Sequence, residues 1–462
     1  MKKYQLPYGN GFQEVTLPEE KVLYDIHGNK ADVQEDIAAA TLAAVRCPIA
    51  SQPLQKVVWK GDKVAVIVSD VTRLVRTAEF LPVIISEINA AGVPDEDITI
   101  IVATGTHRAH THDEDIAVCG KDIVKRIKIH QHDSRNNEEL TDLGVTSFGT
   151  PILIDSYVAE ADKVIITGAV SLHPMAGFGG GRKAVMPGVS GHATIMHNHA
   201  IALAPKVGDG CNPLCETGLL EGNPLHEDMV EVTKKLDPAF LVNMVFTPEG
   251  KLHEVVAGHW YKAWEKGCKD LVAMAGVPIK ELADVVFASA GGSPKDMNLY
   301  QSCKAHMNAV FAVKKGGIMI LTLECPDIKE PAIFTDWFSK SDVLQFEKDV
   351  RADFSIPAFV AFKTRCIVNS LTTYLVTKPE NFEFVRQTGQ IPVASLEEAW
   401  LLAQQELAKQ GKDDYKITIM GHASATMPVL EAGQTPRGRH RRRQYRVHHR
   451  PAFRTPAARK PA

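Results

Sequence analysis

Two histidines, His107 and His173, each stand a few residues after an apolar run that predicts a buried strand. The unperturbed pKa of imidazole is roughly 6.5, so two such groups can alternate as acid and base near neutral pH. A reaction that takes a proton from either face of a substrate would use such a pair. The alternative, that one or both are structural histidines with satisfied hydrogen bonds, stays open at this point.

The stretch from His173 to Lys183 reads HPMAGFGGGRK and contains three consecutive glycines. Glycine lets backbone approach a ligand closely, and a glycine-rich turn after a strand can expose N–H groups to an anion. Lys183 could pair with phosphate, attack a carbonyl-type carbon if its pKa is lowered, or be a solvated surface lysine. The phosphate-binding loop pattern fails, because Arg182 replaces its last glycine and Ala184 replaces its metal-binding hydroxyl.

Three further imidazoles follow at His192, His197 and His199. Neutral imidazole is a common metal ligand, but no carboxylate is adjacent to complete a protein-only cage. A metal held chiefly by a cofactor, with one histidine from the protein, fits this shortage of ligands. Cys211 and Cys215 have C-x3-C spacing without a second pair nearby, which disfavours zinc.

A candidate anion clamp consists of Arg73, Tyr300, Gln301 and Lys304. In a helix, Tyr300 and Lys304 share one face and Gln301 borders it. Cations beside neutral donors suit the carboxylate and hydroxyl of a small acid. A solvated helix face is the alternative, and the preceding Gly291–Gly292 turn argues against it.

Continuous apolar runs separated by helical segments must position these residues. The runs at 63–69, 97–102 and 163–170 predict buried strands, and 283–289 predicts the first strand of a second series. The fold class predicted is α/β, with two domains of mainly parallel sheets flanked by helices. Because ligands bind outside the carboxyl ends of parallel strands, the groups that follow these strands are expected to converge.

The chain divides into three parts in this prediction. Residues 1–277 form an N-terminal α/β cofactor-binding domain, rejoined by a returning segment at 412–433, and residues 278–411 form a C-terminal substrate-clamping domain. The tail, 434–462, holds nine Arg and one Lys without Asp or Glu, and is expected to be a disordered or aberrant extension. The rest has 42 basic and 55 acidic residues, a formal charge of −13. This acidic body disfavours a nucleic-acid-binding role.

The composition of the chain and its apolar segments indicate in which cell compartment the protein is expected. The chain has 462 residues, 45% of them hydrophobic, and no apolar run reaches the roughly 18 residues of a membrane span. The N-terminus lacks the apolar region of a signal peptide. The eight scattered cysteines are therefore expected to stay reduced, in a cytoplasmic protein without a membrane partner.

Taken together, these stretches resemble the nickel-dependent lactate racemase family. The resemblance covers roughly residues 5–430 in order, and the H-x3-G-F-x-G-G-R-K stretch is its most specific part. His199 falls at the expected distance after Lys183. The matching segments are SDVTR at 69–73, ATGTHR at 103–108, residues 173–183 with Pro187-Gly188 after them, and YQSCK at 300–304.

The resemblance implies a two-domain enzyme with its active site in the interdomain cleft. It implies a nickel-pincer nucleotide, a Ni(II) pyridinium bisthiocarboxylate mononucleotide, covalently bound through Lys183 by a thioamide, with His199 as the protein ligand on nickel. His107 and His173 resemble the two general acid/bases. By the same resemblance the other cofactor-binding residues are Asp70, Thr72, Arg73, Thr104 and Gly105, and the substrate-binding residues are Arg73, Tyr300, Gln301 and Lys304.

The implied activity is racemisation or epimerisation of a small 2-hydroxy acid, lactate or a relative, by reversible hydride transfer. Cofactor-synthesis proteins would be partners. One departure is that family members often carry a Trp near 356–359, where this chain has none. Either Phe359 replaces it as a cofactor-facing aromatic, or the alignment shifts at this point. A nucleotide-phosphate-binding phosphotransferase and a non-catalytic cofactor carrier remain as alternatives.

Overall fold

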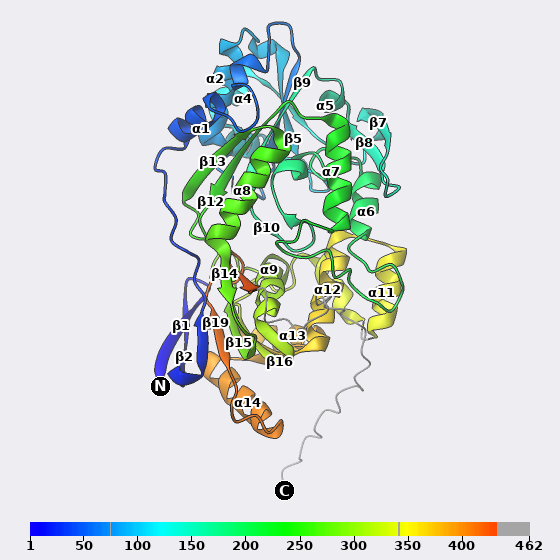
Figure 1. The fold of residues 1–462 in the computed structure, drawn as a ribbon. Helices are drawn as coiled ribbons and strands as arrows, with labels where there is room; N and C mark the ends of the chain where they lie inside the picture. The colour runs from blue at the N-terminus through cyan, green and yellow to red at the C-terminus, as the bar shows by residue number, and fades with distance from the viewer. Residues whose placement is uncertain (74, 341, 432–462) are drawn as a thin grey trace.

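The computed structural model describes residues 1–73, 75–340 and 342–431, and the predicted tail at 434–462 lies outside these residues. Two lobes stand one above the other, and each is built on a 6-stranded sheet (Figure 1). Among the helices of the described residues, none combines the length and the hydropathy needed to cross a membrane.

The sheet of the N-terminal lobe is parallel except at one edge, where β12 and β13 are antiparallel. Its apolar strands carry helices on both faces, as continuous Val/Ile runs require. Helix α2 (Thr77–Ala90) packs on one face of the sheet, and α8 (Trp260–Ala275) packs on the other. The strand order is β13 (Leu252–Gly258), β12 (Phe240–Phe246), β9 (Lys163–Val170), β4 (Val64–Ser69), β5 (Ile98–Ala103) and β6 (Lys128–Gln131).

The sheet of the C-terminal lobe is parallel throughout. Helices α9 (Leu299–Ala309), α12 (Ile356–Ser370) and α14 (Leu396–Lys409) pack around it. The order is β18 (Ile391–Val393), β17 (Thr372–Val376), β16 (Val313–Thr322), β15 (Ala283–Ser289), β19 (Ile417–Met420) and β3 (Val22–Asp25). Both lobes thus confirm the predicted α/β class with mainly parallel sheets.

The second sheet draws on both ends of the described chain. Strand β19 lies between β15 and β3, so the expectation that 412–433 rejoins the first domain is wrong for its strand. The physical reason is that all four residues of β19 are buried in the parallel ladder beside β15. The hairpin of β1 (Lys2–Tyr8) and β2 (Gly11–Leu17) packs its apolar side chains on the same core.

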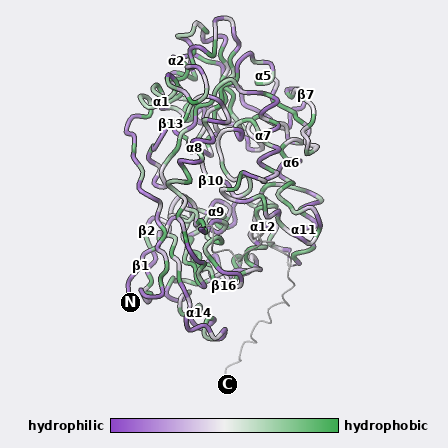
Figure 2. Tube along the Cα trace, viewed as in Figure 1, coloured by the Kyte–Doolittle hydropathy of each residue, from purple (hydrophilic) through white to green (hydrophobic). Residues whose placement is uncertain are grey.

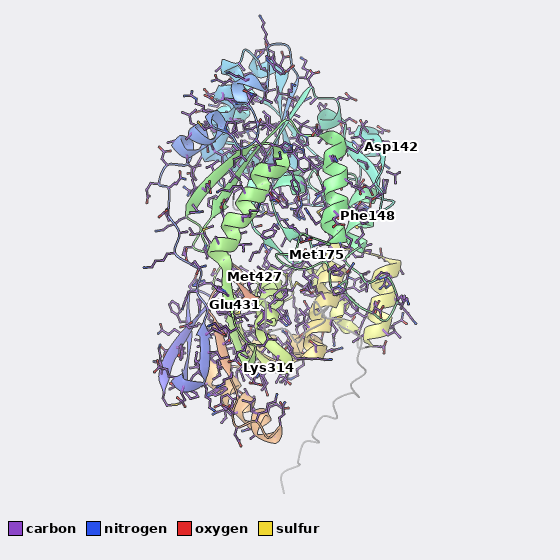
Figure 3. The ribbon with its side chains drawn as sticks, in the orientation of Figure 1. Asp142, Phe148, Met175, Lys314, Met427 and Glu431 are labelled. Carbon is purple, nitrogen blue, oxygen red and sulfur yellow. The ribbon has the colours of Figure 1, made fainter. Side chains whose placement is uncertain are left out.

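The lobes are joined near the boundary predicted around Gly276. There β14 (Gly276–Ile279) pairs in parallel with β20 (Met427–Leu430). In Figure 2 the hydrophobic colour follows the inner strands of each lobe, while hydrophilic stretches lie mostly in outer loops and on outer helix faces. Figure 3 shows Met175 and Met427 near the junction of the lobes, with Lys314 far from it.

Candidate active site

The three strand ends singled out from the sequence are neighbours. Strand β4 pairs with β5 on one side and with β9 on the other, all in parallel. Asp70 follows β4, Thr104 follows β5, and His173 follows β9, so the carboxyl ends of adjacent strands deliver all three. The predicted convergence is what this strand order produces.

His107 forms a hydrogen-bonded pair with Asp70. The distance from His107 Nδ1 to Asp70 Oδ2 is 2.7 Å, and the Thr72 hydroxyl donates to the same carboxylate at 2.9 Å. Burial raises the pKa of Asp70, but the hydrogen bond from His107 and the one from Thr72 outweigh it and leave the pKa lowered. A carboxylate on Nδ1 holds the tautomer in which Nε2 is free to take a proton.

His110, which sequence reasoning missed, positions the loop that carries Asp70. Its Nε2 accepts from the backbone N–H of Val71 at 2.9 Å, and its Nδ1 lies 3.1 Å from Asp115 Oδ1. His110 is buried, so this arrangement is shielded from water. The sequence signal that could have found His110 is its position three residues after His107, in the same loop at the end of β5.

The Thr104–Gly105 turn joins the His107 loop to the lysine loop. The hydroxyl of Thr104 donates to the backbone carbonyl of His132, so this side chain already has a structural partner. The backbone N–H of Gly105 donates to the carbonyl of Gly188 at 3.0 Å. The turn therefore lies against the segment that follows Lys183.

Arg182 points into the protein rather than toward a ligand. Its side chain is 0% exposed and donates to the carbonyls of Phe178 at 2.8 Å and Ala176 at 2.6 Å, and to His226 Nδ1 at 3.0 Å. Its guanidinium lies 4.1 Å from the ring centroid of Trp264. This arginine holds the shape of the glycine-rich loop.

The glycines allow close packing of the loop against the lobe interior. Gly180 has φ +70°, and a Cβ there would lie 2.6 Å from Asn243 Oδ1. The same Oδ1 accepts from the backbone N–H of Gly181 at 2.8 Å, and the Lys183 N–H donates to the Gly180 carbonyl at 3.1 Å. Two N–H groups of the loop therefore already have protein partners, which weakens the phosphotransferase alternative.

Lys183 and His173 lie in a strongly cationic environment. Burial lowers the pKa of Lys183 well below its usual value, and the charges of Arg182 and Arg73 lower it further. The His173 pKa is also well below its usual value, first because of burial and then because of Lys183, His199, Lys304 and Arg73. A lysine with a lowered pKa has the neutral amine that a nucleophile needs.

His199, on α6 (His192–Ala200), has the geometry of a metal ligand. It is 2% exposed, and its Nδ1–H donates to the Ile195 carbonyl at 3.0 Å, which leaves the lone pair of Nε2 free. Burial, with the charge of Lys183, lowers its pKa to about 3, so the ring is neutral. Within the described ranges, no three His, Cys, Asp or Glu residues are grouped so that they could hold a metal ion.

The C-terminal lobe supplies the predicted substrate residues from one helix. Asn298 caps α9 and accepts from the backbone N–H of Gln301 at 2.9 Å, while the Gln301 side chain is exposed. Burial raises the pKa of Tyr300 to about 12, and burial followed by the charge of Arg73 lowers the pKa of Lys304. Arg73 therefore acts on groups of the other lobe, and the site draws residues from both lobes.

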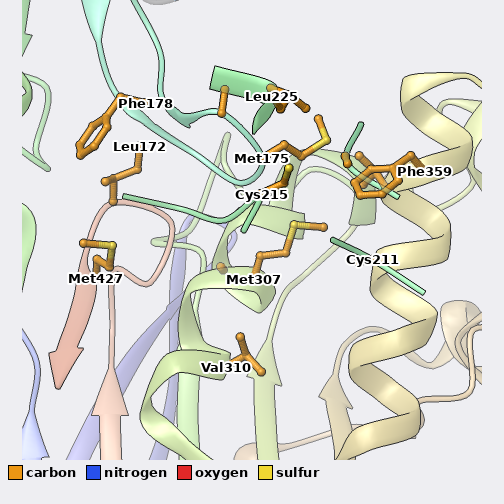
Figure 4. Close-up of a cluster of buried hydrophobic side chains, with 14 of the residues drawn as sticks. Leu172, Met175, Phe178, Cys211, Cys215, Leu225, Met307, Val310, Phe359 and Met427 are labelled. Carbon is orange, nitrogen blue, oxygen red and sulfur yellow. The ribbon is translucent and has the colours of Figure 1, made fainter. Parts of the chain in front are cut away.

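Phe359 lies on α12 and is 1% exposed. It belongs to an apolar cluster with Met175 and Met307 at the junction of the lobes (Figure 4). Cys211 and Cys215 belong to the same cluster, and all eight cysteines are free thiols. Thiols in such apolar surroundings pack as small hydrophobic side chains.

Comparison with known proteins identifies the family. The model of the lactate racemase N-terminal domain matches residues 8–210, and that of the lactate racemase C-terminal domain matches residues 279–426. The chain belongs to the lactate racemase family. Members of this family are isomerases that require a nickel cofactor, so this chain is an enzyme of the isomerase class.

Individual relatives agree with this assignment. The lactate racemase of Thermoanaerobacterium thermosaccharolyticum is 31% identical over 428 residues, which are 91% of this chain and 97% of that protein. The lactate racemase of Lactiplantibacillus plantarum is 34% identical over 281 residues, which are 61% of this chain and 64% of that one.

Solved structures agree as well. The structure of the lactate racemase apoprotein from T. thermosaccharolyticum has a TM-score of 0.83 at 30% identity and covers 93% of this chain and 100% of that one. A protein of Thermotoga maritima shares the fold, with a TM-score of 0.59 at 18% identity over 82% of this chain and 96% of that one.

Proposed function

We propose that the chain is a racemase or epimerase of a small 2-hydroxy acid, lactate or a related 2-hydroxy carboxylate, that uses a nickel-pincer nucleotide. The observation that carries this proposal is the surroundings of His173. Burial and then the charges of Lys183, His199, Lys304 and Arg73 lower the pKa of His173. His107 follows β5, which lies two strands from β9 in the same sheet. The groups proposed as amine nucleophile, metal ligand and anion clamp therefore lie close enough to His173, a proposed acid/base, to act on its charge, which supports the proposal.

The attachment roles follow from the protonation states of the protein groups. Lys183, with its lowered pKa, would provide the neutral amine that forms the thioamide. His199 would bind nickel through Nε2, the ring nitrogen that Ile195 leaves free. When bound, the cofactor would supply a reversible acceptor for the α-hydride of the substrate.

The two imidazoles would handle the hydroxyl proton. His107 is oriented by Asp70 so that Nε2 can accept the substrate's O–H proton as the α-hydride leaves and a planar 2-keto acid forms. Inversion of the centre would need return of the hydride to the opposite face of that carbon, and His173 would be the group that protonates the oxygen. Arg73 and Lys304 would hold the carboxylate, with Tyr300 and Gln301 beside it.

The experiment that tests the proposal uses protein made alongside the cofactor-synthesis proteins. Chiral 2-hydroxy acids are screened for optical inversion and for exchange of the α-hydrogen. We expect inversion with a lactate-like acid, a covalent adduct on Lys183 by mass spectrometry, and loss of nickel in His199→Ala. His107→Ala and His173→Ala should each abolish inversion, whereas the exposed His112→Ala should not.

Two outcomes would refute parts of this proposal. Full inversion in His107→Ala or His173→Ala would refute the acid/base roles. A Lys183 adduct with nickel but no inversion of any acid tested would instead support a cofactor carrier.

We also propose a cytoplasmic location, because the eight thiols are all free.

A further inference from the structure

One short segment of the N-terminal lobe, residues 187–191, joins the proposed attachment lysine to the proposed nickel ligand. Lys183 lies a few residues before this connecting segment, and α6, which carries His199, begins directly after it. The positions of both groups in the lobe therefore depend on how the connecting segment is fixed.

The carbonyl of Ser190, inside the connecting segment, has a buried imidazole as its partner. His132 follows β6, and its side chain is 0% exposed. Nε2 of His132 lies 2.9 Å from the Ser190 oxygen, and Nδ1 lies 2.9 Å from Oδ2 of Asp155, the last residue of β8 (Pro151–Asp155). The ring therefore links the connecting segment to this strand.

Both partners of the His132 ring are hydrogen-bond acceptors. A carbonyl oxygen can only accept, so Nε2 must carry a hydrogen to bond with Ser190. Burial raises the pKa of Asp155, but hydrogen bonds from His130 and His132 leave it lowered, so the carboxyl is ionised near neutral pH and also accepts. Nδ1 must then carry a hydrogen as well, and an imidazole with hydrogen on both nitrogens is a cation.

The carboxylate of Asp155 balances this charge. Its Oδ2 also lies 3.0 Å from Nε2 of His130, and its Oδ1 accepts from the backbone N–H of Tyr157 at 3.1 Å. His130 needs a hydrogen only on Nε2 for this contact, so one carboxylate faces one cation. A buried ion pair persists when additional hydrogen bonds satisfy its remaining polar atoms. Both ring nitrogens of His132 and both oxygens of Asp155 have such partners.

The backbone of His132 connects the same residue to the Thr104–Gly105 turn. The carbonyl of His132 accepts from the hydroxyl of Thr104. The N–H of Gly105 in turn donates to the carbonyl of Gly188 in the connecting segment at 3.0 Å. His132 therefore fixes the connecting segment directly, through its ring, and indirectly, through this turn.

We propose that His132 is a positioning residue that stays an imidazolium in the folded protein near neutral pH, and that its pair with Asp155 fixes the connecting segment between the attachment lysine and the nickel ligand. The inference rests on the proposed roles of Lys183 and His199. The buried His132 ring acts through the carbonyl of Ser190. A neutral ring would set a nitrogen lone pair against one of its two oxygen partners and would release that contact.

The test reads the charge of His132 by ¹⁵N NMR of the imidazoles in the full-length protein, near neutral pH and before cofactor loading. His132→Gln and His132→Asn identify the signal, so that either one suffices if the other does not fold. We expect two protonated ring nitrogens in the wild type and one in Asp155→Asn, because a buried cation without its anion is costly. Asp133→Asn removes an exposed carboxylate next to His132 and should leave both nitrogens protonated.

A second readout uses protein loaded with the cofactor. His132→Gln can still donate a hydrogen bond but carries no charge, and it should weaken nickel retention against a chelator about ten-fold, the lower end of the effect of groups that orient metal ligands. The Asp133→Asn control should retain nickel as the wild type does.

Two results would overturn the proposal. One is a wild-type His132 with an unprotonated ring nitrogen, a reading that needs no cofactor. The other is a folded His132→Gln that retains nickel as the wild type does. Neither depends on whether any 2-hydroxy acid is inverted: a doubly protonated His132 in a protein that inverts no acid would count against the proposed function alone.

Discussion

Asp70→Asn separates two roles that the site allows for this carboxylate. Asp70 either orients His107, as the 2.7 Å contact indicates, or binds the cofactor, as the family resemblance implies. Asparagine has nearly the same shape, and its amide oxygen can still accept from Thr72. The change therefore removes the charge while the loop keeps its packing.

The magnitude follows from the geometry of the pair. A hydrogen bond to a charged group contributes about 1.5–3 kcal/mol. The side chain of Asp70 is 5% exposed and that of His107 is 42% exposed, so water screens one partner. The lower part of that range, about 1.5–2 kcal/mol, corresponds to a ten- to thirty-fold loss of kcat/KM.

The assay measures kcat/KM in both directions on variants matched for nickel content, with the exposed Asp142→Asn as control. We expect a ten- to thirty-fold loss with normal nickel and normal Lys183 adduct. A loss below three-fold at equal nickel would refute the orienting role. Failure to retain the cofactor would instead assign Asp70 to cofactor binding.

Two further predictions concern stability. Arg182→Met should lower the free energy of unfolding, measured by urea titration, by about 3 kcal/mol, because three buried acceptors lose their donor and Trp264 loses its cation. Arg182→Lys should restore only part of this free energy. An unchanged urea midpoint in Arg182→Met would contradict the prediction. Burial raises the pKa of Asp155, but hydrogen bonds from His130 and His132 leave it lowered, so its stabilisation is present above the unfolded value of about 3.9 and is lost as the pH falls through the folded pKa. Circular dichroism against pH should show a flatter acid limb in Asp155→Asn, and an identical limb would count against the pair.

The sequence predicted the strand ends well because a fully buried parallel strand is a continuous apolar run. The first polar residues after such a run therefore mark the end of the strand. The neighbours β9, β4 and β5 are such strands. The directions of side chains in the glycine-rich loop could not be predicted from the sequence, because the positive φ values at Gly180 and Gly181 belong to neither helical nor strand periodicity. Arg182 therefore gave no sign that it points inward.

Long-range partners were also hidden. Nothing near Lys363 in the sequence distinguishes it from a solvated helix lysine, because its partners lie in the loop after β9 and in the segment around Cys215. The pairing of β19 with β3 was missed for the same reason. Short strands far apart in the chain carry no local signal of the sheet that they join.

The pairing of β3 with β19 bears on how the polypeptide acquires its structure as it leaves the ribosome. Strand β3 and the β1–β2 hairpin emerge before the rest of the described strands, yet β19 is almost the last described strand to be made. The lobe between β3 and β14 can finish folding earlier, since domains fold as units during synthesis. Until β19 is made, residues 1–25 keep their apolar surface exposed to solvent. A fragment that starts at residue 278 would lack β3, the edge strand of the second sheet.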